Sequence, residues 1–133
     1  MKLRKAVLDT GLFTAHLTAP DNETTALREA LRTWFCYTTV FNGIELFRDA
    51  RSPRQRRAVE DVLSAVKILG MNGRNAGKFA RLTNFGPGGF PLNALIAGIC
   101  IEARLPLVTD RAGEFERYRK LRVVPAARTA HKR

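Results

Sequence analysis

Four acidic side chains stand at positions where a sheet could bring them together. Asp9 comes directly after one apolar segment of the chain, and Asp110 comes directly after another. Glu114 lies four residues beyond Asp110, and Glu45 lies in a predicted helix between two apolar residues. In open α/β sheets, ligands bind beyond the carboxyl ends of the strands. If the two apolar segments are neighbouring strands, we expect these carboxylates to meet at one edge of the sheet.

A cluster of carboxylates indicates either a cation site or a set of ordinary structural residues. Like charges at short range repel one another unless a cation lies among them, and oxygen ligands favour hard divalent cations such as Mg²⁺ and Mn²⁺. Such a cation beside a basic surface suits phosphodiester cleavage, because it polarises a phosphoryl oxygen and activates water. The alternative is that Asp9 and Asp110 are turn or cap residues and that Glu45 pairs with an arginine. Spacing alone leaves both readings open.

The chain is strongly basic. Of its 133 residues, 23 are Lys or Arg and 12 are Asp or Glu, which gives a formal net charge of +11. A surface with this charge attracts polyanions, and RNA is one of them. Arg51 and Arg54 begin the first basic cluster, and two more follow at 117–122 and 128–133. The same charge also fits a solubilising surface or a face that meets an acidic protein.

The elements that must position these residues alternate between strand and helix. The apolar spacing predicts strands at 3–8, 34–38, 67–70, 105–109 and 123–124. It predicts helices at 11–18, 22–32, 41–50, 53–66, 72–82 and 92–103. Asp21 is expected to cap the second helix, and Ser52 with Pro53 to open the fourth. Alternation of this kind predicts an α/β fold with a parallel sheet and helices on both faces.

Several classes of protein are excluded by composition. The longest apolar run, 94–101, is eight residues long, and a spanning helix needs about 20, so we expect no membrane protein. The apolar segment near the amino end is interrupted at Asp9, which argues against an export signal. Cys36 and Cys100 lie in apolar stretches and are interpreted as buried, unpaired residues of a cytoplasmic protein. Two histidines and no CxxC pattern leave little for a zinc site.

An ordered set of short motifs resembles the PIN-domain family, and more narrowly the VapC-type toxins of toxin–antitoxin pairs. The motifs are Val7-Leu8-Asp9-Thr10, Glu45-Leu46, Ala94-Leu95-Ile96-Ala97, Leu107-Val108-Thr109 and Glu114-Phe115. The resemblance spans residues 3–125. It implies a three-layer α/β/α sandwich around a parallel sheet of about five strands. We therefore expect one PIN-like domain over residues 1–125 and a basic tail over residues 126–133.

The resemblance also implies an activity and a site. Proteins of this family hold Mg²⁺ or Mn²⁺ in an acid cluster and hydrolyse RNA, and the toxins form homodimers that a small antitoxin silences. Asp9 matches the first acid, Glu45 the second and Glu114 the last. Thr10 and Thr109 match hydroxyl residues that hydrogen-bond near the metal. Asp9, Glu45, Glu114 and Thr109 are therefore the expected catalytic group.

The sequence departs from the family pattern at the remaining positions of the site. Asn93 stands where the family has a third Asp, and Arg111 stands where it has Asp or Asn. Asp110 comes one residue early, and Gly11 replaces an Asn. We expect Asn93 and Asp110 to complete the metal ligands with the three acids, and Arg111 to join Arg51 and Arg54 in binding RNA. The alternative is a degenerate, inactive site in a module that binds RNA or a protein.

Overall fold

A single parallel sheet organises the protein, whose computed structural model describes residues 2–82 and 92–126. The strand order is β3-β2-β1-β4-β5, with β1 at Lys5–Leu8, β2 at Phe35–Thr39, β3 at Lys67–Leu69, β4 at Leu107–Thr109 and β5 at Val123–Pro125. The helices are α1 (Thr10–Thr18), α2 (Ala26–Thr33), α3 (Val40–Asp49), α4 (Pro53–Leu63), α5 (Ala76–Leu82) and α6 (Leu92–Ala103), with short 3₁₀ turns η1 (Gly73–Asn75) and η2 (Ala112–Phe115). The expected α/β architecture is confirmed.

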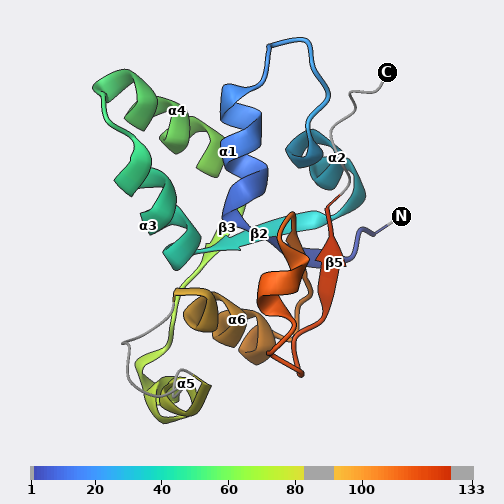
Figure 1. The fold of residues 1–133 in the computed structure, drawn as a ribbon, viewed down its shortest axis with the longest axis vertical. Coiled ribbons are helices and arrows are strands. Elements are labelled where there is room, and N and C mark those ends of the chain that lie inside the picture. The colour runs from blue at the N-terminus through green and yellow to red at the C-terminus, as the bar shows by residue number, and fades with distance from the viewer. Residues whose placement is uncertain (1, 83–91, 127–133) are drawn as a thin grey trace.

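The sheet is covered on both faces, so the core has two halves. Along β1, Ala6 and Leu8 face one side while Val7 faces the other, and all three are fully buried. The first side packs against α1 to α4, with Phe13 at its centre, and the second packs against α6 through Ile96. Figure 1 shows α1 to α4 on one side of the sheet and α6 on the other. A parallel sheet covered in this way needs apolar residues on both faces of its central strand.

Local signals set most helix starts. Ser52 accepts a hydrogen bond from the backbone N–H of Gln55, with Pro53 in the first turn, so the predicted start of α4 is confirmed. The predicted cap of α2 was wrong. That helix begins at Ala26, and Thr25 is the cap, accepting from the N–H of Arg28. His16 Nδ1 lies 2.8 Å from the Thr25 hydroxyl, and this contact between α1 and the cap is not visible in the local sequence.

The two cysteines are unpaired and buried, as predicted. Burial raises the pKa of Cys36 to about 11 and that of Cys100 to about 12, so both stay protonated near neutral pH. They behave as small apolar side chains of the core. Among the described helices, none combines the length and the apolar character needed to cross a membrane. Residues 83–91 and, apart from Ala126, the predicted basic tail at 126–133 lie outside the described residues.

The strand order places the ends of three strands side by side. β1 pairs with β2 on one side and with β4 on the other, all in parallel, with Leu8 opposite Val108. The expectation that the strands before Asp9 and Asp110 are neighbours is therefore confirmed. The chain builds β2 and β3 on one side of β1 and then switches to β4 and β5 on the other. The carboxyl edge beside such a switch point is where α/β sheets bind ligands.

Candidate acid site at the carboxyl edge of the sheet

Asp9 is the centre of the site and is fully buried. Its Oδ1 accepts from Asn42 Nδ2 at 3.0 Å and from Arg111 Nη2 at 3.1 Å. Its Oδ2 accepts from the Thr109 hydroxyl at 2.7 Å and from Arg111 Nε at 2.7 Å. Burying a carboxylate is costly unless it is paired and hydrogen-bonded. Four donors, two of them from one guanidinium, satisfy that requirement here.

Asn42 connects the first turns of α1 and α3 and was not singled out from the sequence. Its Oδ1 accepts from the hydroxyl of Thr39 at 2.7 Å, and its backbone N–H donates back to that hydroxyl, which caps α3. Its Nδ2 donates to Asp9 and, at 2.8 Å, to the Thr10 hydroxyl. The side chain is fully buried. The available signal was the Thr-x-x-Asn spacing at a helix start, a variant of the usual capping box.

Glu45 reaches the same edge from α3. The Thr10 hydroxyl donates to Glu45 Oε1 and accepts from Asn42, so a short chain of bonds links Glu45 to the groups around Asp9. Glu45 is half-buried and its neighbour Leu46 is buried, so Glu45 stands at the boundary of the core. The structure therefore brings Asp9, Thr10 and Glu45 together.

Glu114 and Asn93 lie on the outer side of the cluster. Glu114, in η2, accepts from Asn93 Nδ2 at 3.3 Å and from Arg111 Nη1 at 3.2 Å. The Glu114 side chain is 58% exposed, whereas that of Asp9 is fully covered. Asn93 stands in the first turn of α6 and presents its N–H group to the carboxylate. Among the described contacts, Asn93 serves as a donor to an acid.

Asp110 takes a different direction from Glu114. It is exposed, and its carboxylate lies against Gly11 in the first turn of α1. A Cβ on Gly11 would stand 2.3 Å from Asp110 Oδ1, so the absence of a side chain at Gly11 is what lets the carboxylate come so close. No hydrogen bond described for the site joins Asp110 to Asp9 or Glu45. Glu114 rather than Asp110 is thus the acid tied into the network.

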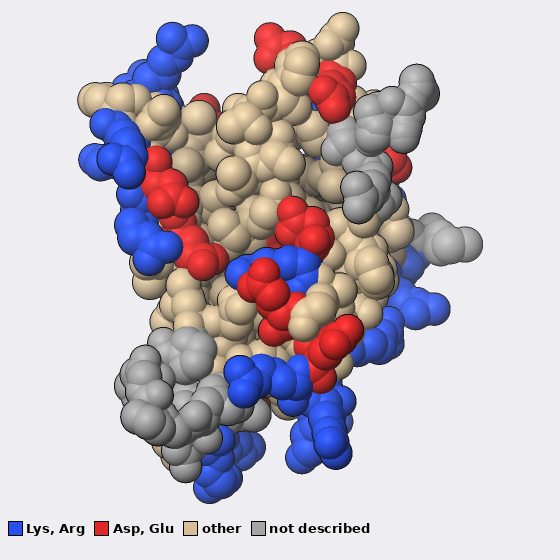
Figure 2. Space-filling model, viewed as in Figure 1, with Lys and Arg blue, Asp and Glu red and all other residues tan. Residues whose placement is uncertain are grey.

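Arg111 lies among the acids. Its guanidinium contacts Asp9 and Glu114, and its central carbon lies 5.2 Å from the centroid of the Phe115 ring. Hydrogen bonding to Asp9, together with the nearby charges of Glu45 and Glu114, raises the pKa of Arg111, so the group keeps its charge. Its backbone N–H is held by the Thr109 hydroxyl at 3.1 Å. Figure 2 shows acidic and basic side chains in contact near the centre of the face.

Arg51 and Arg54 lie apart from this network. Both are exposed, Arg51 just before α4 and Arg54 in its first turn. None of the hydrogen bonds or ion pairs described for the site joins them to its acids. Figure 2 shows basic side chains along the side of the molecule formed by α4. The predicted RNA-binding arginines therefore divide into an exposed pair on this side and Arg111 among the acids.

The residues present do not fit a divalent cation while Arg111 is in place. A carboxylate offers about four acceptor positions, and the four donors to Asp9 use them all. The oxygen of Glu114 nearest the cluster already accepts two bonds. Within residues 2–82 and 92–126, no three His, Cys, Asp or Glu side chains are grouped so as to hold a metal. The acceptor oxygens of Asp9 and Glu114 are arranged to bind the Arg111 guanidinium.

The fold has clear counterparts among solved structures. No protein-family model matches the sequence, and no curated protein does. A chain of DNA-bound VapBC from Salmonella typhimurium superposes with a TM-score of 0.71 at 25% identity, over 92% of this chain and 98% of that one. A toxin–antitoxin complex from Klebsiella pneumoniae gives 0.70 at 19% identity, over 92% and 98% of the two chains. VapBC2 from Rickettsia felis, bound to a promoter DNA fragment, gives 0.70 at 17%, over 92% and 99%. The resemblance to VapC-type toxins is confirmed at the level of the fold.

Proposed function

We propose that this chain, which has the fold found in VapBC complexes, is the toxin of a toxin–antitoxin pair and an endoribonuclease that uses Mg²⁺ or Mn²⁺. The observation that carries the proposal is the gathering of Asp9, Glu45 and Glu114 at the carboxyl edge of the sheet, next to the switch point. Three carboxylates held close together repel one another, and a purely structural role does not require that repulsion. The cytoplasm, where RNA is found and free cysteines persist, is the place of action in this proposal.

The side chains of the site have separable roles in the proposal. Thr109 and Asn42 fix the orientation of Asp9, and Thr10 fixes that of Glu45. With Arg111 displaced, Asp9, Glu45 and Glu114 would hold the divalent cation, which would supply charge stabilisation at the phosphoryl group. Exposed Arg51 and Arg54 attract the RNA backbone, and such contacts weaken steeply with salt. Asn42 and Thr109 are buried, whereas Arg51 and Arg54 are exposed, as contact with an RNA strand at the surface requires.

The change Glu45→Gln tests the activity with little disturbance of the fold. Glutamine keeps the size of the side chain and an oxygen that can accept from Thr10. We expect the wild-type chain to cleave single-stranded RNA oligonucleotides in Mn²⁺ but not in EDTA. We expect the variant to be at least about 100-fold slower, because loss of even an outer partner of a metal site costs about 10–100-fold. Glu60→Gln, an exposed change on α4, is the control. Equal cleavage by both variants, or cleavage in EDTA, would contradict the proposal.

A second candidate is a module that binds RNA or a protein through an inactive site. The observation that favours it is the saturation of Asp9 by the Arg111 guanidinium. The same oligonucleotide experiment separates the two candidates. Binding that persists in EDTA, with no product at millimolar Mn²⁺, would support the module and count against the nuclease.

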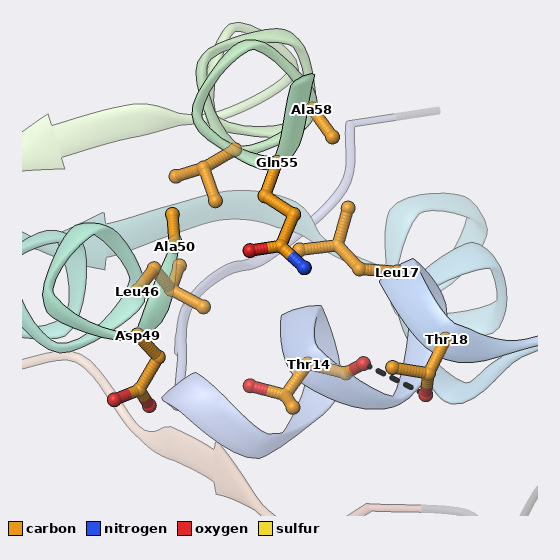
Figure 3. Close-up of a pocket in the computed structure, with 9 residues that line it drawn as sticks. Thr14, Leu17, Thr18, Leu46, Asp49, Ala50, Gln55 and Ala58 are labelled. Carbon is orange, nitrogen blue, oxygen red and sulfur yellow. Dashed lines mark hydrogen bonds between the residues drawn. The ribbon is translucent and has the colours of Figure 1, made fainter. Parts of the chain in front are cut away.

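The antitoxin in this proposal docks on a groove between α1, α3 and α4. The groove has a volume of about 210 Å³, and its lining is mostly small or apolar, with Leu17 from α1, Leu46 and Ala50 from α3, and Ala58 from α4. Figure 3 shows these side chains around the groove and the Gln55 amide extending into it. A helix that places one apolar residue there fits this shape. Leu12 and Leu27 do not line the groove, because both are buried in the core.

Blocking the groove should weaken the complex without unfolding the chain. Ala58→Arg places a long charged side chain at the groove, and arginine is a good helix former. We expect affinity for the antitoxin of this proposal to fall by about 10-fold or more, as for a central interface residue. Calorimetry with the purified partner measures it. Ala65→Arg, the same change at an exposed position after α4, should leave affinity unchanged. Equal binding by both variants would exclude this groove.

In this proposal, a second copy of the chain binds to the exposed apolar face of α3 and β3. This face carries Val40, Ile44, Phe47 and Ile68, with Ile44 and Ile68 each 50% exposed. Contiguous exposed apolar surface marks interaction sites. Two copies that each carry a charge of +11 repel one another. Contact through an apolar face brings fewer charged side chains close together than contact through a basic face does. The homodimer in the proposal therefore leaves the antitoxin groove and the acid site on other surfaces.

A further inference from the structure

We propose that Arg111 is a built-in counter-ion that competes with divalent cations for the acid site. With its guanidinium on Asp9, the resting chain excludes the metal, and a cation binds only when the Arg111 side chain leaves. The inference concerns cation binding by this chain and stands whether or not the chain cleaves RNA. It rests on the pairing of Arg111 with Asp9 and on which of the four donors to Asp9 can move.

Arg111 is the only movable donor of the three residues that bind Asp9. Asn42 and Thr109 are fully buried, and each is held by a second hydrogen bond of its own. The Arg111 side chain is 26% exposed and long, so it can rotate towards solvent. A cation that needs an acceptor position on Asp9 must displace a donor. The displaced donor is therefore the Arg111 guanidinium.

The backbone around Arg111 allows the side chain to leave without unfolding the site. Its N–H stays bonded to the Thr109 hydroxyl at 3.1 Å, which anchors the residue next to β4. The contact of the guanidinium with the Phe115 ring belongs to the position bound to Asp9, so it favours the resting position, and a cation must displace it together with the ion pair. The movement required is a side-chain rotation.

Charge repulsion prevents the Arg111 guanidinium and a divalent cation from occupying the acid site together. The guanidinium neutralises one of the three negative charges of Asp9, Glu45 and Glu114, and a divalent cation in the same cluster would lie within a few ångströms of it. Like charges at such separations repel strongly where the surroundings are partly buried. Removing Arg111 both frees acceptor positions and leaves the acids without a partner. Both effects favour a cation.

The test is Mn²⁺ binding by the wild-type chain and by Arg111→Met, followed through the electron paramagnetic resonance signal of free Mn²⁺. Methionine keeps much of the length and removes the charge. We expect the variant to bind Mn²⁺ at least about 10-fold more tightly than the wild type. In EDTA its melting temperature should fall below that of the wild type, and Mn²⁺ should raise it more than in the wild type, because ligand binding to the folded state stabilises it.

The matched control is Arg32→Met, which removes an exposed arginine paired with Glu29 at 3.3 Å. It should bind Mn²⁺ as the wild type does. If Arg111→Met does not fold, Arg111→Lys replaces it: lysine keeps the charge but loses the bidentate contact, and its Mn²⁺ affinity should still exceed that of the wild type. Equal binding by the wild type and the folded variant, or no binding by the variant, overturns the inference. Tighter Mn²⁺ binding with no RNA cleavage by any form would leave it standing and count against the nuclease.

Discussion

Replacing Asp9 with alanine is expected to lower the free energy of unfolding by about 3 kcal/mol, the largest loss for any single change in the site. Asp9 is fully buried and accepts four hydrogen bonds. Its removal leaves the buried Thr109 hydroxyl without its acceptor and takes one acceptor each from Asn42, which keeps Thr10, and from Arg111, which keeps Glu114. Breaking a buried ion pair from one side typically costs about 3–5 kcal/mol. We place this case at the lower end, because the Arg111 side chain is 26% exposed and can turn to solvent. Urea unfolding followed by circular dichroism measures the change.

Two comparisons separate burial from charge at this position. Asp9→Asn keeps the size of the side chain and one acceptor oxygen, so it should cost clearly less than the alanine variant. Asp21→Ala removes an exposed acid and should change the unfolding free energy by no more than about 0.5 kcal/mol. A loss below about 1 kcal/mol for Asp9→Ala would mean that the four hydrogen bonds contribute little to stability.

The second large effect is expected for Asn42→Ala, at about 2–3 kcal/mol. The change keeps the backbone N–H that Thr39 caps, but it removes the Oδ1 that accepts from Thr39 and the amide that donates to Asp9 and Thr10. Losing the reciprocal half of the capping box costs at most about 1 kcal/mol, and leaving buried polar groups unpaired adds about 1–3 kcal/mol. Because Thr10 orients Glu45, RNA cleavage should fall as well. The same unfolding experiment measures stability, and the oligonucleotide assay measures cleavage.

Asn72 offers a control of the same residue type. Its Oδ1 accepts from the N–H of Arg74 at 2.9 Å, at the start of the exposed turn η1. Asn72→Ala therefore removes a cap that belongs to no buried network, and we expect a loss of at most about 1 kcal/mol. Similar losses for the two asparagines would show that the Asn42 amide acts only as a local cap.

The strands and most helices could be predicted because their signals are local. The unbroken apolar run of Ala6, Val7 and Leu8 marks a strand covered on both faces, and Ser52 with Pro53 marks a helix start. The start of α2 could not be predicted, because Asp21 offers an equally good cap in sequence. Thr25 has the additional contact with His16, a residue on another helix. Both Asp21 and Thr25 could cap α2 as far as the local sequence shows, and the tertiary contact with His16 favours Thr25.

Part of the site followed from the same kind of reasoning. Parallel strands bring their carboxyl ends to one edge, so the meeting of Asp9 with Thr109 was predictable once the strands were assigned. Asn42 was missed because its spacing from Thr39 also describes an ordinary helix cap. Its second role, as donor to Asp9, depends on how α3 lies against β1 and cannot be read from that spacing.

The succession of strands and helices, and the acids at the ends of β1 and β4, could therefore be predicted from the amino-acid sequence. Those features depend on residues close together in the chain, whose periodicity and capping act locally. The group that neutralises Asp9 could be identified only in the folded chain. Its partner Arg111 lies 102 residues away, and the pair forms because β1 and β4 are hydrogen-bonded neighbours. An ion pair depends on the distance between two charges in space, and for segments so far apart in sequence only the folded chain sets that distance.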